Sequence, residues 1–108
     1  ALGSIDPNTV YIIEEPEDEY ILKSVNYTVG ADDRTIDNDT AGVTTTMLDA
    51  TLVPKKIYAI CNSSEGIITV DTTLAQSMYL PGGAVTGITL LDGESITLQS
   101  TGTSWRAL

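Results

Sequence analysis

Apolar and polar residues alternate along most of the chain, which is typical of half-buried β-strands and not of amphipathic helices. Residues 55–62 form the clearest predicted strand, with Ile57, Ala59 and Cys61 on one face. Cys61 is the only cysteine, so we interpret it as a small buried hydrophobe without a disulfide partner in the chain.

Further strands are predicted on the same pattern, separated by turns rich in Gly, Asp, Asn and Ser. In residues 43–48 the side chains of Val43, Thr45 and Met47 share one face. The other predicted strands are residues 24–29, 34–37, 67–70 and a brief one at 78–80, with a loop or short helical turn at 49–54. The spacing of about 8 to 12 residues between strands is typical of a sandwich, a small barrel or an intertwined fibre module.

The C-terminal residues 87–108 predict a three-stranded meander. Ile88, Leu90, Ile96 and Leu98 alternate with polar residues, and Asp-Gly at 92–93 lies between the two runs. This dipeptide between alternating apolar residues is a strong hairpin signal. A second turn at 100–104 leads to Trp105, the only Trp, which we expect in the core.

The N-terminal residues 1–22 differ from the rest because they contain six acidic residues and no Lys or Arg. We therefore divide the chain into an acidic, extended N-terminal arm (1–22) and a β-rich body (23–108). Residues 10–13 could form a strand limited by Pro7 and Pro16. The arm is either a solvated connector or an anchor that adds its strand to a neighbour's sheet.

Composition narrows the class of protein. A chain of 108 residues is long enough for one domain. The composition has no Phe but many Val, Ile, Leu and Thr residues, and it favours β-strands. The fold class is therefore all-β, a small antiparallel β-sandwich or barrel-like module. The net charge of −10 disfavours binding to nucleic acid or to anionic membranes, and the apolar runs are too short for membrane insertion.

No catalytic, cofactor-binding or metal-binding residue is predicted, and we expect a protein that is not an enzyme. The chain has no His, so triads and zinc sites lack their usual components. Asp32, Asp33, Asp37 and Asp39 cluster in sequence, but they do not match a calcium loop, and Arg34 would oppose the cation. We interpret these acids as turn formers.

Three stretches together are similar to a β module of tailed-bacteriophage structural proteins: YTVGADDRTID (27–37), KKIYAICN (55–62) and DGESITLQSTGTSW (92–105). The resemblance covers roughly residues 24–108 and is most specific at 94–105. Asp49 stands where the pattern often has Pro, and Thr101 replaces the frequent Asp before Gly102. No receptor-binding or catalytic residue is carried over.

The resemblance implies a non-catalytic structural protein of a bacteriophage virion, associating as a homotrimer. It would decorate the capsid or form a head or tail fibre-like projection. From the break in composition near residue 23 and the strand-like residues 10–13, we expect residues 1–22 to dock on the major capsid protein or another virion protein. The alternative is a carbohydrate-binding module that contacts host-surface glycans, with Trp105 and the Tyr residues as a stacking platform.

Overall fold

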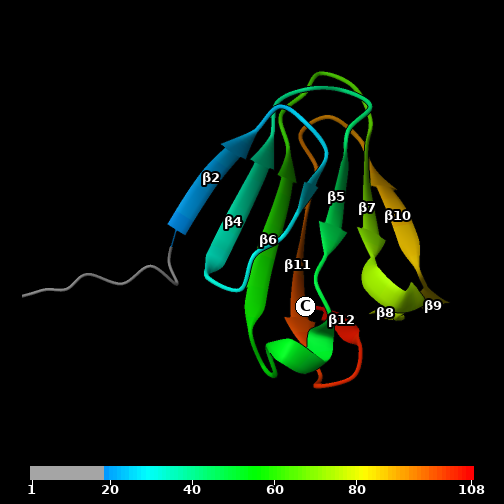
Figure 1. The fold of residues 1–108 in the computed structure, drawn as a ribbon. Helices are drawn as coiled ribbons and strands as arrows, with labels where there is room; N and C mark the ends of the chain where they lie inside the picture. Colours follow the sequence, from blue (N-terminus) through cyan, green and yellow to red (C-terminus); the bar gives the residue numbers. More distant parts are fainter. Residues whose placement is uncertain (1–18) are drawn as a thin grey trace, which may run out of the picture.

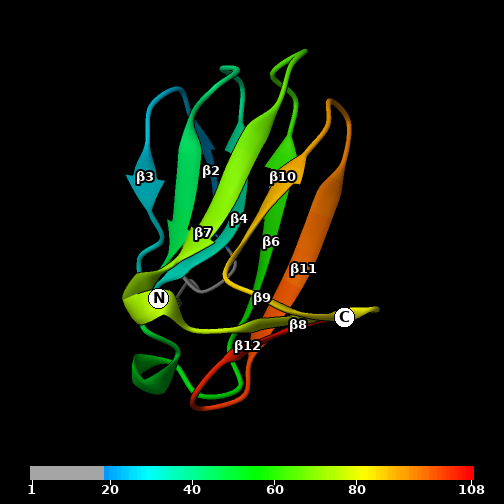
Figure 2. The same ribbon diagram turned by 90° about the vertical axis from the view of Figure 1, so that its right-hand side faces the viewer.

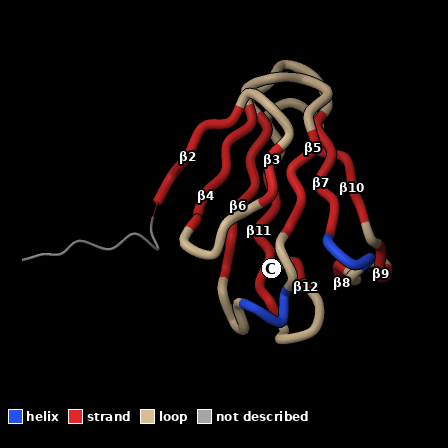
Figure 3. The backbone as a smooth tube through the Cα atoms, in the orientation of Figure 1, coloured by secondary structure: helices blue, strands red, loops and turns tan. Residues whose placement is uncertain are grey.

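The computed structural model describes residues 19–108, which fold into two packed β-sheets and contain no α-helix (Figures 1 and 3). The larger sheet has the strand order β2 (Glu19–Lys23), β4 (Asp33–Asn38), β6 (Ile57–Asn62), β11 (Ser95–Ser100), β12 (Trp105–Ala107), β8 (Met78–Leu80) and β9 (Gly83–Val85). The smaller sheet has the order β10 (Gly87–Leu90), β7 (Ile68–Thr72), β5 (Thr44–Met47) and β3 (Tyr27–Thr28). Two short 3₁₀ turns complete the fold, η3 (Ala50–Leu52) and η4 (Thr73–Ala75). The all-β prediction is confirmed.

Among residues 19–108, the first six strands alternate between the sheets, so that β2, β4 and β6 lie in the larger one and β3, β5 and β7 in the smaller one (Figures 1 and 2). Neighbours within a sheet are therefore two strands apart along the chain and run in the same direction. The pairs β2–β4, β4–β6, β3–β5 and β5–β7 are all parallel. The prediction of an antiparallel sandwich is wrong in this respect, because it assumed that consecutive strands pair with each other.

The predicted three-stranded meander is also wrong in its first half. Strand β10 pairs with β7 in the smaller sheet, whereas β11 pairs with β6 in the larger one. The Asp92-Gly93 turn therefore crosses between the sheets and does not close a hairpin. The backbone of Asn62 on β6 holds this crossing segment with two hydrogen bonds. Its carbonyl accepts from Gly93 N at 2.8 Å, and its N–H donates to Glu94 O at 2.9 Å.

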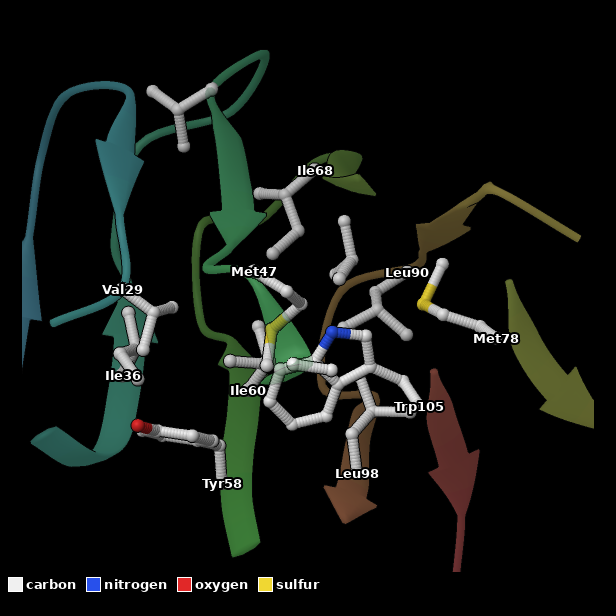
Figure 4. Close-up of a cluster of buried hydrophobic side chains, with 13 residues drawn as sticks. Val29, Ile36, Met47, Tyr58, Ile60, Ile68, Met78, Leu90, Leu98 and Trp105 are labelled. Atoms are coloured by element: carbon white, nitrogen blue, oxygen red, sulfur yellow. The ribbon is translucent and has the colours of Figure 1, made fainter. Parts of the chain in front are cut away.

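The second half of the meander is confirmed as an antiparallel hairpin of β11 and β12. Its turn is closed by the bond from Thr101 N to Ser104 O at 2.9 Å. Trp105 on β12 is fully buried, as expected. Its indole meets the ring of Tyr58 edge to face, with centroids 5.7 Å apart (Figure 4).

The core lies between the two sheets and draws side chains from both (Figure 4). From the smaller sheet, Val43, Thr45 and Met47 are buried, as their shared face predicted. From the larger sheet come buried side chains of β4, β6, β11, β12 and β8, namely Ile36, Tyr58, Ile60, Leu98, Trp105 and Met78.

The predicted inner face of β6 is wrong by one residue. The side chains of Tyr58, Ile60 and Asn62 point into the core. Those of Ile57, Ala59 and Cys61 are half-buried and point away from it. Both faces of this strand are largely apolar, so alternation alone could not distinguish them. The larger side chains, Tyr58 and Ile60, bury more apolar area by pointing inward.

The remaining strand predictions differ at their ends. The predicted strand 24–29 is reduced to β3, and Val25 is 63% exposed in the preceding turn. Strands β2 and β9 were not predicted. Strand β2 crosses the predicted boundary at residue 22, so residues 19–22 belong to the larger sheet through their pairing with β4. The strand proposed for residues 10–13 lies outside the described residues.

Candidate functional site

The acidic residues of 32–39 serve the fold in different ways. Asp33 is buried and accepts hydrogen bonds from the Tyr27 hydroxyl at 2.5 Å and from Gly30 N at 2.7 Å. Asp37 accepts from the Tyr20 hydroxyl at 2.7 Å and from Ser63 Oγ at 2.8 Å. Within residues 19–108, no three His, Cys, Asp or Glu residues are grouped so as to hold a metal ion.

The two buried or partly buried tyrosines near Asp33 have raised pKa values. Burial, followed by the hydrogen bond to Asp33, raises the pKa of Tyr27 to about 12. Burial, followed by the charges of Asp33 and Asp32, raises the pKa of Tyr58 to about 12. Both phenols therefore stay neutral at physiological pH and act as hydrogen-bond donors, with Tyr58 bonded to the carbonyl oxygens of Gly30 and Ala31 at 3.2 Å.

The aromatic side chains of the described residues do not gather into a sugar-stacking platform. Trp105 and Tyr58 are in the core. Tyr20 and Tyr79 are 58% and 42% exposed, but they lie on β2 and β8, five strand spacings apart in the larger sheet. At about 4.8 Å per spacing this is roughly 24 Å, too far for both rings to stack on one sugar unit.

Cys61 lies half-buried on the outward side of β6, opposite Asp37 of β4. Burial, followed by the nearby Asp37 charge, raises the pKa of the Cys61 thiol. A thiolate is the reactive form of cysteine, so this environment makes Cys61 a weak nucleophile. The geometry argues for a packing role and not for catalysis.

The two sheets present outer faces of different composition. On the larger sheet the register places outward-pointing residues from six strands in rows. We call this the large outer face, and its main residues are Tyr20, Leu22, Thr35, Asp37, Ile57, Ala59, Cys61, Thr97, Gln99, Arg106 and Tyr79. On the smaller sheet the outward residues are mostly threonines; we call this the small outer face, formed by Thr28, Thr44, Thr46, Thr69, Thr89 and Asp71.

The large outer face is the main feature that reasoning from the sequence missed. The sequence contains one sign of this face, because β6 has apolar residues on both of its sides. We assigned the row formed by Ile57, Ala59 and Cys61 to the core, whereas it points outward. A strand with apolar residues on both faces indicates either burial on both sides or an outward surface that is apolar enough to bind a partner.

Comparison of the chain with protein-family models, with curated proteins and with solved structures finds no match. No helix among residues 19–108 is long and apolar enough to cross a membrane.

Proposed function

We propose that the chain is a non-catalytic structural protein of a bacteriophage virion, which decorates the capsid or forms a head or tail fibre-like projection. The main support is the position, within the fold, of the three stretches that resemble phage modules. They cover β3, β6 and β11, all of β4 but its last residue, and the first residue of β12; β4, β6, β11 and β12 are adjacent in the larger sheet. The resemblance therefore falls on residues that build one continuous framework.

The chemistry of the described residues fits a structural role. The conspicuous carboxylates Asp33 and Asp37 are bonded to tyrosine hydroxyls and to other groups of the fold. The only thiol is held in its less reactive form by burial. What remains at the surface is two β-sheet faces and four edge strands, which suit assembly more than catalysis.

We further propose that the body associates as a homotrimer and that the acidic N-terminal arm anchors it to the major capsid protein or another virion protein. The last four residues of the predicted arm, 19–22, belong to β2, an edge strand of the larger sheet as described. The alternative of glycan recognition loses its principal aromatic residue, because Trp105 is in the core.

The test uses particles of the phage that encodes the chain, prepared from a strain that lacks its gene. The purified full chain and a variant without residues 1–18 are mixed with these particles and sedimented. We expect the full chain to sediment with the particles and the shortened chain to stay in solution. The shortened chain keeps β2, and its circular dichroism and melting temperature should match those of the full chain.

Two results would contradict these proposals separately. Failure of the full chain to bind any virion preparation would overturn the virion role. Binding of the shortened chain as strong as that of the full chain would overturn the anchoring role of the arm and leave the virion role intact.

A further inference from the structure

We propose that the free edge of β10 binds residues 10–13 of a second copy of the chain, which add to the smaller sheet as a further strand. The inference rests on the self-association included in the proposed function, and it names the two segments that make the contact. Residues 1–9 are then left for the contact with the virion.

The first argument is that β10 lacks the features that usually protect an edge strand. Among residues 19–108, the two sheets end at β2, β9, β3 and β10. Strands β9 and β3 have only three and two residues, and β2 has a charged residue at each end. Strand β10 has four residues and contains neither charge nor proline. Short or charged edges resist the addition of a further strand, whereas an edge such as β10 permits it.

The second argument is the direction of the backbone groups of β10. Thr69 on β7 donates its N–H to Val43 O at 3.1 Å, on the side of β5. Thr89 lies opposite Thr69 in the antiparallel pair of β7 and β10. Because the groups of Thr69 point away from β10, this pair is not hydrogen-bonded, and the N–H and C=O of Thr89 point out of the sheet. Gly87, two residues earlier, points the same way, so an added strand can bond to both residues.

The third argument is the distribution of charge. Residues 72–91 include η4, β8, β9 and β10 and contain no Asp, Glu, Lys or Arg. This is the longest uncharged stretch in a chain with a net charge of −10. Copies of such a chain repel each other where their carboxylates meet. Residues 7–13 of the arm are also uncharged, so the two stretches can meet without this repulsion.

An apolar strand at this edge would also cover part of the core. Ile88 on β10 packs against the core but is only partly buried, whereas Leu90 on the same strand is 5% exposed. The arm residues 10–13 are Val-Tyr-Ile-Ile, so an added strand places apolar or aromatic side chains beside Ile88 whichever of its faces turns inward. Their burial adds hydrophobic stabilisation to the backbone hydrogen bonds.

The arm that fills the edge must come from another copy. Strands β2 and β10 lie on opposite sides of the molecule (Figure 1). Strand β11 is three strand spacings, about 14 Å, from β2, and β10 lies in the other sheet, about 10 Å away. The direct line from β2 to β10 is therefore roughly 17 Å or more and passes through the core, so the chain needs a longer path around it. Residues 14–18, which join the arm's strand to β2, span at most about 17 Å when fully extended.

The acidic residues 14–19 disfavour a hairpin between the arm and its own β2. Five of these six residues are Asp or Glu, and the sixth is Pro16. A hairpin would crowd the carboxylates into one loop, whereas their mutual repulsion favours an extended chain. An extended run carries residues 10–13 away from their own β2 and towards a neighbouring copy.

The contact joins two different surfaces, so it can close into a ring. In a ring of three copies, each copy gives one arm and receives one, and every β10 edge is filled. At low concentration the copies separate, and the melting temperature is then that of the single body with or without the arm.

The experiment uses single substitutions in the full chain, each with a matched control. Thr89→Pro removes the outward N–H of β10 without breaking a bond to β7, and Thr89→Ala keeps it. Ile12→Asp places a charge in the arm's strand, and Asn8→Asp places the same charge outside it. Light scattering should give three times the chain mass of 11.5 kDa for the wild type and both controls, and the mass of one chain for Thr89→Pro and Ile12→Asp. Fluorescence of buried Trp105 reports that each variant is folded.

Mixing the two defective variants gives the most specific test. Thr89→Pro keeps an intact arm and Ile12→Asp keeps an intact edge, so one arm-to-edge contact can still form between them. The equimolar mixture should contain particles of twice the chain mass, whereas neither variant forms them alone. A general loss of self-association would not be restored by mixing.

Hydrogen exchange gives a readout that does not require Thr89→Pro to fold. At a concentration where about nine tenths of the wild-type chains are assembled, the amides of Gly87 and Thr89 should exchange about tenfold more slowly than in Ile12→Asp. The amides of Ile88 and Leu90 point towards β7 and should be protected in both proteins.

The inference is overturned if folded Thr89→Pro or Ile12→Asp keeps the wild-type mass, if either control loses it, or if the mixture contains only single chains. It is also overturned if the wild type is a single chain at every concentration. Protection of the Thr89 amide that persists after dilution to single chains would likewise overturn it, because a second copy could not then be the occupant. Sedimentation of the wild type with virions decides the proposed function independently of these results.

Discussion

The apolar core around Trp105 and the buried amides of Asn38 and Asn62 lie between the same two sheets, yet they join them differently. The indole of Trp105 packs against Tyr58 and other apolar side chains, and its Nε1 has no hydrogen-bond partner among the described residues. The Asn62 amide nitrogen, in contrast, donates to Gly66 O and Leu90 O, both at 2.8 Å, and its oxygen accepts from Ser64 N at 2.9 Å.

Asn38 repeats this arrangement on the neighbouring strand, where it is in register with Asn62. Its amide oxygen accepts from Thr45 Oγ1 of the smaller sheet at 2.8 Å, and its nitrogen donates to Cys61 O at 3.1 Å. Packing contacts are non-directional and tolerate rearrangement, whereas amide bonds require one register. The comparison indicates that the core supplies most of the stability and the amides specify how the sheets align.

The largest effect should come from Trp105→Ala, because it removes the largest buried side chain and leaves a cavity. We expect a loss of about 3–5 kcal/mol in the free energy of unfolding, measured by urea denaturation with circular dichroism. Trp105→Phe should cost clearly less, because the lost N–H has no hydrogen-bond partner among residues 19–108 and part of the side-chain volume is kept. Equal costs for the two variants would contradict a core held by packing.

An intermediate effect is expected for Asn62→Ala, which removes three hydrogen bonds and leaves the buried carbonyl of Leu90 and half-buried groups of Ser64 and Gly66 without this partner. The expected loss is about 2–4 kcal/mol. The matched control is Asn26→Ala, an exposed residue whose side chain accepts one bond from Thr44 N at 2.8 Å, and its cost should be about 1 kcal/mol. Hydrogen exchange should show faster opening at Ser64 and Gly66 in Asn62→Ala only. Similar costs for the two variants would show that the buried amides have no special role.

The smallest effect on stability at neutral pH is expected for Tyr27→Phe, which removes the hydrogen bond between the Tyr27 hydroxyl and Asp33. Its effect should depend on pH, because the Tyr27 phenol ionises. The folded pKa of Tyr27 is about 12, above its ordinary value of 10.0, so folding favours the neutral phenol. This contribution is complete below pH 10 and is lost as the pH rises towards 12. Tyr27→Phe should reduce the slope of unfolding free energy against pH in this window, and Asn62→Ala should leave it unchanged because amides do not titrate. An unchanged slope in Tyr27→Phe would contradict the assignment.

Alternation predicted the strands of residues 43–48 and 55–62 and the burial of Trp105, because each reflects local side-chain chemistry. It could not predict that β10 and β11 belong to different sheets. Asp-Gly does form a turn, with Gly93 at φ 83°, but the direction in which the chain leaves that turn is set by distant partners. Those partners are the backbone groups of Asn62, about thirty residues earlier, and no local pattern reveals them.

The inward-pointing row of β6 was mispredicted for a related reason. On β6, Tyr58 and Ile60 compete with Ile57, Ala59 and Cys61 for the core, and only the neighbouring strands decide which row points inward. The role of Asn38 and Asn62 was likewise hidden, because asparagine in a sequence ordinarily indicates a turn. The buried amides became apparent only when the two sheets were placed together.

The alternation of strands β2 to β7 between the two sheets also has a consequence for the speed of folding. Each parallel pair joins segments separated by a full passage through the opposite sheet, as in Ile36 with Ile60 and Thr45 with Val70. No hairpin within β2 to β7 can form early and act as a template, so loop closure must precede most of the sheet pairing. We therefore expect slow refolding for a domain of this size, with the pairing of β6 complete only when β11 joins β4 beside it.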